Sequence, residues 1–237
     1  MDREKHREVI DSFLGYMNDR TDHYILKGDT SLMECYNLDR FSEDIDLDST
    51  DHDSIDNIIQ EYCKEHGYEQ PRLAKDTPTV KRFFIHYEKP NPSGEVKPLK
   101  VEVSFRSKIL NPEEVCKING ISVYSINRIC QMKCSAYNSR DKIRDLYDIV
   151  YIYREFKDEL SPASIDAIGD AFSYKGIEHV EYLLSDQKDD LIDKDKLASD
   201  FPDVYIDLGL LSDDPIETED LIDDVEEDDY DDYDPVD

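Results

Sequence analysis

Apolar residues recur along this chain at two spacings, the three to four residues typical of a helix and the two residues typical of a strand. The chain begins with the helical spacing. Within residues 3–18 five apolar side chains fall on one helical face, which predicts an amphipathic helix. The expected elements that follow are a strand at 24–26 entering a turn at Gly28, a helix at 30–37, a strand at 44–48 and a helix that Asp53 can cap and that ends at Gly67.

Strict alternation of apolar and polar residues takes over in the middle of the chain. Residues 79–88 and 98–105 predict two strands joined by a turn at 90–94. A hairpin is expected at 115–124, because Asn119-Gly120 is a favoured two-residue turn. From Ile126 to about residue 200 the pattern is helical, although Asn138-Ser139 could break the first helix.

These patterns predict an α/β (α+β) protein built on a mixed sheet flanked by helices. We expect a first domain over residues 1–125, a helical domain over 126–205 and an acidic tail over 206–237. Alternation also decides which strand residues carry chemistry, since successive side chains of a strand point to opposite faces. Asp44 and Asp46 should therefore share one face while Ile45 and Leu47 enter the core.

Two carboxylates placed in this way are hard oxygen ligands of the kind that Mg²⁺ prefers. Glu102 lies on the polar face of the strand at 98–105, and on a neighbouring strand it would complete a three-acid metal site. Such sites stabilise the attacking and leaving oxygens of a phosphoryl or nucleotidyl transfer. The alternative is that all three acids simply face water.

The net charge of −30 is concentrated near the C-terminus. Residues 213–237 contain 15 acidic residues and no basic one, and such a segment cannot bury enough apolar surface to offset its ordering entropy. We therefore expect a disordered tail. It either solubilises the protein or mimics nucleic acid, lying across a basic groove until displaced or binding a cationic partner.

The remaining composition favours a cytoplasmic protein. No apolar run approaches the ~18 residues of a membrane span, and the N-terminus lacks the layout of a signal peptide. The five cysteines form no C-x-x-C pair, so reduced thiols are expected.

Four dispersed motifs resemble one known family. Residues 26–32 read LKGDTSL, residues 40–46 read RFSEDID, residues 100–105 form the strand with a third acid, and residues 133–148 contain K-x-x-A followed by RDLYD. Over residues 5–155 the chain resembles the nucleotidyltransferase toxins of the abortive-infection AbiEii/AbiGii family, within the DNA polymerase β-like nucleotidyltransferase superfamily.

The resemblance implies a toxin of a toxin–antitoxin or phage-defence system, with an antitoxin partner. It would move a nucleoside monophosphate from a nucleoside triphosphate (NTP) to an acceptor, with tRNA 3′ ends favoured, and would use Mg²⁺ (or Mn²⁺). Asp44 and Asp46 would bind the metal, with Glu102 as third ligand or as the group that activates the attacking hydroxyl. The implied nucleotide contacts are Gly28, Thr30, Ser31, Lys133 and Arg140, of which Lys133 also counts as catalytic.

One residue departs from the family pattern. Asp29 stands where the family usually has a second glycine, and a carboxylate beside a triphosphate is repulsive unless it points away or caps the helix. Two other classes therefore stay open: an enzyme that modifies protein side chains with a nucleotide, and an inactive relative that binds nucleotide or a partner.

Basic residues decide how well RNA could bind, because phosphate contacts dominate nucleic-acid affinity. A continuous helix over 127–150 would align Lys133, Arg140 and Arg144, and the spacing of Arg140, Arg144 and Asp148 suggests mutual ion pairs. A second basic cluster is expected near the strands, formed by Lys75, Lys81, Arg82, Lys97, Lys100, Arg106 and Lys108.

Overall fold

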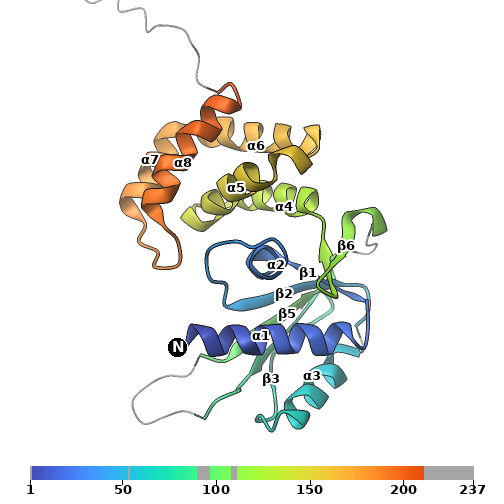
Figure 1. The fold of residues 1–237 in the computed structure, drawn as a ribbon. Coiled ribbons are helices and arrows are strands. Elements are labelled where there is room, and N and C mark those ends of the chain that lie inside the picture. The colour runs from blue at the N-terminus through green and yellow to red at the C-terminus, as the bar shows by residue number, and fades with distance from the viewer. Residues whose placement is uncertain (1, 53, 90–96, 108–110, 211–237) are drawn as a thin grey trace, which may run out of the picture.

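The computed structural model describes residues 2–52, 54–89, 97–107 and 111–210, and its centre is a mixed β-sheet with helices on both faces (Figure 1). The elements are α1 (Arg3–Asn18), β1 (Tyr24–Lys27), α2 (Gly28–Cys35), β2 (Asp44–Ser49), α3 (Ser54–Glu65), β3 (Arg72–Thr77), β4 (Val80–Ile85), β5 (Leu99–Ser104), β6 (Val115–Ile118), β7 (Ile121–Tyr124), α4 (Ile126–Ser139), α5 (Ile143–Phe156), α6 (Pro162–Lys175), α7 (Ile177–Asp186) and α8 (Lys194–Asp207).

The seven described strands run in the order β3-β4-β5-β2-β1-β7-β6. The central pair β2 and β5 is parallel, and β2 is antiparallel to β1 on its other side. The hairpins β3–β4 and β6–β7 form the two edges. This order places β5 directly beside β2, so the two strands that carry the predicted acids are neighbours.

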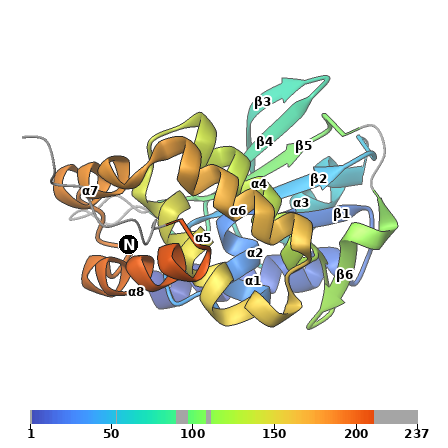
Figure 2. The same ribbon diagram turned by 90° about the horizontal axis from the view of Figure 1, so that it is seen from above.

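Helices cover the sheet unequally. Helix α1 contacts α3 and β5 on one face, whereas α2 contacts β1, β2 and α4 on the other. Helices α4 to α8 form a layer above α2, and the β3–β4 hairpin extends beyond them (Figures 1 and 2). The apolar sides of β2 and β5, represented by Leu47 and Val101, are fully buried, which leaves the opposite side of both strands for polar residues.

Most predicted elements are confirmed. The five apolar residues of α1 are buried, as are Ile55, Ile58, Ile59 and Tyr62 of α3. The hairpin at 115–124 turns at Asn119 and Gly120 with φ of 52° and 83°, the left-handed values that a two-residue hairpin turn requires. The helical region is confirmed as well, while the domain boundaries stay a prediction.

The structure differs from the expected elements at α2 and β3, and the helix break that the sequence left open at Asn138-Ser139 is present. Helix α2 begins at Gly28 rather than at residue 30. Strand β3 was missed because five of its six residues are exposed and the sixth is half-buried, so no apolar alternation marks it. A continuous helix over 127–150 does not form, since α4 ends at Ser139 and α5 begins at Ile143.

Some predictions lie outside the described residues: the cap at Asp53, the turn at 90–94, Lys108 and the acidic segment 213–237. Within the described residues, the helices are all too short or too polar to span a membrane.

Candidate functional site

A polar cavity of about 440 Å³ lies where β2 begins, between the sheet and the start of α5. Its wall brings together acids of the predicted metal site and cations from two separate parts of the chain, β5 and residues 140–144. The lining residues are Asp29, Ser42, Glu43, Asp44, Asp46, Lys100, Arg140, Lys142, Ile143, Arg144, Asp145, Gln187 and Asp189. The cavity therefore lies between the sheet and the helical layer, and most of its lining residues are charged.

The three predicted acids share one face of the sheet. In the parallel register of β2 and β5, Asp46 is the partner of Glu102 and Asp44 is the partner of Lys100. Ile45, between the two aspartates, is fully buried on the other face. The alternation seen in the sequence therefore produces the arrangement that was expected of it.

Two cations neutralise the outer carboxylates. Lys100 Nζ lies 2.7 Å from Asp44 Oδ2, and Arg82, from the next strand, lies 2.6 Å from Glu102 Oε2. Burial raises the pKa of Asp46, the charges of Asp44 and Glu102 raise it further, and Lys100 opposes them. The site thus carries an excess of negative charge that is centred on Asp46.

These oxygen donors are of the type that Mg²⁺ or Mn²⁺ takes, and an added cation would relieve the repulsion around Asp46. The side chains do not point to one common metal position. Among the described residues, no three acidic, histidine or cysteine side chains lie close enough to hold a metal ion. The reason is that Asp44 is directed to Lys100 and Glu102 to Arg82. A metal ion fits the donor set if it competes with these two cations.

Gly28 places the start of α2 directly against these acids. Its φ of +73° lies in the left-handed region, and a Cβ atom at this position would lie 3.4 Å from Asp46 Oδ2. Glycine therefore satisfies both the turn and the close approach. The sequence motif around Gly28 is explained by this contact with the second aspartate of the D-x-D pair.

Thr30 and Ser31 direct their hydroxyl groups into the protein. Thr30 Oγ1 donates to the carbonyl of Asp44 and lies 2.7 Å from Ser42 Oγ. Ser31 Oγ donates to the carbonyl of Gly28 at 2.6 Å. Both residues are buried and neither lines the cavity. Their visible contribution is to fix the turn and the backbone of Asp44.

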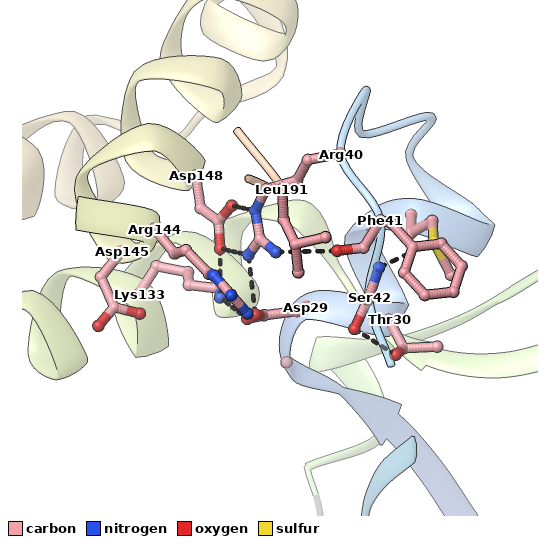
Figure 3. A network of polar contacts seen from close by, with 12 residues as sticks. Asp29, Thr30, Arg40, Phe41, Ser42, Lys133, Arg144, Asp145, Asp148 and Leu191 are labelled. Carbon is pink, nitrogen blue, oxygen red and sulfur yellow. Dashed lines mark hydrogen bonds and ion pairs between the residues drawn. The ribbon is translucent and has the colours of Figure 1, made fainter. Parts of the chain in front are cut away.

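Beneath the cavity lies a buried network of two acids and two bases (Figure 3). Arg40 donates through Nε and Nη2 to the two oxygens of Asp148, each at 2.6 Å. Lys133 Nζ lies 2.5 Å from Asp148 and also contacts Asp29. Arg40 Nη2 lies 2.8 Å from Asp29 Oδ2. We call Asp29, Arg40, Lys133 and Asp148 the buried network.

The buried network contains two residues on which the sequence analysis depended, Asp29 and Lys133. Burial raises the pKa of Asp29, but the charges of Lys133 and Arg40 outweigh it and hold that pKa well below its usual range. The Lys133 side chain is only 5% exposed and is not part of the cavity wall, whereas Asp29 is. Lys133 thus lies behind Asp29 as seen from the cavity.

Arg140 lines the cavity but is not paired as expected. It donates to both oxygens of Asp145, at 2.6 and 2.7 Å, while Arg144 pairs with Asp189 and Asp148 pairs with Arg40. The predicted ion pairs among Arg140, Arg144 and Asp148 are therefore wrong. The break before α5 removes the helical spacing between Arg140 and Arg144. Arg144 and Asp148 keep their spacing within α5, but Asp148 is buried against Arg40 and Lys133, whereas Arg144 contacts Asp189.

The second basic cluster is largely neutralised by acids. Lys81 pairs with Asp56, Arg82 with Glu102, Lys97 with Glu43 and Lys100 with Asp44. Four of its seven members are therefore not free cations.

Several residues that shape the site had no site role in the sequence-based prediction. Lys100 was assigned only to a basic cluster, although it shares the strand face of Glu102 at a spacing of two. Asp148 was considered only as an ion-pair partner within its helix, and Arg40 stands in a recognised motif but was not singled out. Gln187 and Asp189 reach the cavity from the segment after α7, and no local pattern in the sequence marks them.

Known structures share this fold. A crystal structure of JHP933 from Helicobacter pylori matches with 25% sequence identity and a TM-score of 0.72, covering 87% of this chain and 91% of that one. A second H. pylori structure matches at 24% identity and a TM-score of 0.70, over 87% and 94%. MenT4, a nucleotidyltransferase toxin from Mycobacterium tuberculosis, matches at 18% identity and a TM-score of 0.50, over 86% and 83%.

The sheet and the adjoining helical layer have the fold of a nucleotidyltransferase. More particularly, the chain belongs to the family of nucleotidyl transferase AbiEii toxins of type IV toxin–antitoxin systems, whose family model matches residues 16–234. None of the curated proteins matches this sequence.

Proposed function

We propose that this nucleotidyltransferase moves a nucleoside monophosphate from an NTP to the 3′ end of an RNA, with tRNA as the favoured acceptor. The observation that carries the proposal is the pairing of Asp46 with Glu102 across β2 and β5, with Asp44 beside them on the wall of the cavity. An acceptor hydroxyl oxygen would form a bond to the α-phosphorus, while the bond to the β-phosphate oxygen breaks and pyrophosphate leaves.

Asp44 and Asp46 would hold Mg²⁺ or Mn²⁺, with Glu102 as third ligand or as the group that accepts the proton of the attacking hydroxyl. A bound divalent ion supplies positive charge that stabilises both the attacking and the leaving oxygen. Arg140, which lines the cavity, would neutralise charge on the leaving pyrophosphate. Lys133 has the same proposed role but lies behind Asp29.

The opening turn would act through its backbone. Gly28 brings α2 beside Asp46, and the amide groups at the start of a helix favour a phosphate. The buried hydroxyls of Thr30 and Ser31 would then hold this turn in shape rather than contact the nucleotide themselves.

An RNA acceptor is favoured by the side chains that continue from the acids towards the sheet edge. Glu102 is the partner of Arg82, and Arg82 is the partner of Lys75 on the edge strand β3. Arg72 stacks over Phe84 with 4.5 Å between its guanidinium carbon and the ring centroid. Arg82 is already paired with Glu102, but Arg72 and Lys75 together with the ring of Phe84 suit a single strand, whose phosphates and bases need both kinds of contact.

The family also implies an antitoxin as partner, and the expected substrates place the activity in the cytoplasm.

The test of the proposal is a label-transfer assay. Purified protein with Mg²⁺ receives each α-labelled NTP and total tRNA, and label on RNA is the expected result. Label on protein would instead identify an enzyme that modifies side chains, and nucleotide binding without any product would identify an inactive relative.

The controls separate the site from the fold. Asp46→Asn should lower the transfer rate by at least about 100-fold, since even groups that merely orient metal ligands are worth 10–100-fold. Asp166→Asn makes the same chemical change on the exposed surface of α6 and should retain activity. Equal activity of the two variants would refute the assignment of Asp46.

A further inference from the structure

The buried network is balanced in charge, and only one of its members faces the cavity. Arg40 and Asp148 are completely buried and the Lys133 side chain is 5% exposed, whereas the Asp29 side chain is 32% exposed. Asp29 is also the only one of the four in the cavity wall. Its carboxylate therefore separates two buried cations from the space in which an NTP would bind.

Asp29 does not have this position because it caps a helix. The cap of α2 is Lys27, and no side chain makes a capping hydrogen bond there. Instead, one carboxylate oxygen of Asp29 contacts Lys133, and the other lies 2.8 Å from Arg40 Nη2. The possibility that Asp29 is simply a helix cap is thus excluded, and its contacts are those of a counter-ion.

Removing the charge of Asp29 would leave two buried cations opposite Asp148 alone. A buried charge without a partner is strongly destabilising, so an anion that entered the cavity would be attracted to the place of the missing carboxylate. A phosphate group has the required charge, and its oxygens accept the same hydrogen bonds from Arg and Lys.

We infer that Asp29 is an internal anion, which fills a phosphate-sized anion site on Arg40 and Lys133 and must be displaced before a nucleotide phosphate reaches them. In this form the contact is autoinhibitory. Its effect on transfer rests on the proposed function, whereas the anion site itself does not depend on any activity of the protein.

The experiment measures pyrophosphate binding without metal, acceptor or turnover. Wild-type protein and Asp29→Asn are unfolded by heat in EDTA, at constant ionic strength, with chloride replaced stepwise by pyrophosphate. Asp29→Asn should be less stable in chloride and should regain stability as pyrophosphate is added, because a ligand of the folded state alone raises the melting temperature. Its pyrophosphate affinity, by calorimetry, should exceed that of the wild type by at least about tenfold.

Glu43→Gln is the matched control. Glu43 lines the same cavity and pairs with the half-exposed Lys97, so its loss removes one negative charge without uncovering the buried cations. It should bind pyrophosphate less than about threefold more tightly than wild type, because an exposed charge is well screened. An equal response of Glu43→Gln and Asp29→Asn would overturn the inference in favour of a general charge effect.

A double variant covers the case in which Asp29→Asn does not fold. Asp29→Asn combined with Lys133→Met restores the charge balance and should fold without responding to pyrophosphate. If the double variant folds while Asp29→Asn stays unfolded even in pyrophosphate, an external anion cannot reach the cations and the inference fails. Rescue of Asp29→Asn by pyrophosphate, but not by chloride, is the expected result. Since no step needs catalysis, failure here would leave the proposed transfer reaction untouched.

Discussion

Replacing Asp148 by asparagine should destabilise this protein more than almost any other isosteric change. Asp148 is completely buried and accepts two hydrogen bonds of 2.6 Å from Arg40, with Lys133 Nζ at 2.5 Å. Asparagine has nearly the same shape, but it lacks the charge and turns an NH₂ group towards a cation. The change therefore tests the electrostatics of the buried network without creating a cavity.

The size of the effect follows from these contacts. Net contributions of hydrogen bonds to charged groups are about 1.5–3 kcal/mol each, and the amide oxygen can keep one of the three. Removing one partner of a buried ion pair generally destabilises a protein by about 3–5 kcal/mol. This range agrees with the loss of two of the three hydrogen bonds. We expect the free energy of unfolding to fall by about 3–5 kcal/mol, a large part of the 5–15 kcal/mol typical of a folded protein.

Urea unfolding followed by circular dichroism measures this difference, with an unchanged m-value as the sign that only stability has moved. Asp203→Asn is the matched control, because Asp203 pairs with Arg154 at 3.4 Å on the surface with its side chain 75% exposed. That variant should stay within about 0.5 kcal/mol of wild type. A loss below about 1 kcal/mol for Asp148→Asn would refute the view that the buried network stabilises the fold.

Two further changes test other parts of the molecule. Gly28→Ala should lower the free energy of unfolding by about 1–2 kcal/mol in urea titrations, since Gly28 has φ of +73°, and a wild-type value would contradict the strained turn. Burial, together with the hydrogen bond and charge of Asp11, raises the pKa of Glu34 to about 7 from 4.5. The folded protein therefore holds a proton that it loses as the pH rises through 7, and wild type should lose stability between pH 5 and 8 relative to Glu34→Gln. Glu61→Gln, on the exposed surface of α3, should follow the wild-type pH profile, and parallel profiles for all three proteins would rule out Glu34 as the titrating group.

The acidic face of the sheet could be predicted from the sequence because strand geometry leaves little freedom. Once Ile45 and Leu47 are buried, Asp44 and Asp46 must share the other face. The same argument holds for Glu102 between Val101 and Val103, all of which the structure confirms. Alternation cannot say which strands are neighbours, and the adjacency of β2 and β5 was available only through the resemblance to a family.

Ion-pair partners could not be predicted, because they depend on contacts between distant parts of the chain. Arg40 and Asp148 are 108 positions apart, whereas spacing on a helix indicates only partners three or four residues away. The local rule therefore assigned Asp148 to Arg144, and that assignment is wrong because Asp148 is buried against Arg40 and Lys133 while Arg144 pairs with Asp189. Strand β3 illustrates the same limit, since its pairing with β4 rather than its own sequence makes it a strand.

The contacts of Arg40 explain why the two most separated motifs occur together in this chain. Arg40 opens the segment RFSEDID and Asp148 closes RDLYD, so their ion pair fastens the loop that leads into β2 to helix α5. Ser42, in that loop, forms a hydrogen bond with Thr30. Asp44 and Asp46, two and four residues after Ser42, line the cavity. One motif thus contains both the anchor and the acids that the anchor positions. Changes at Arg40 or Asp148 should consequently lower stability and transfer together, whereas a change at Asp46 should lower transfer alone.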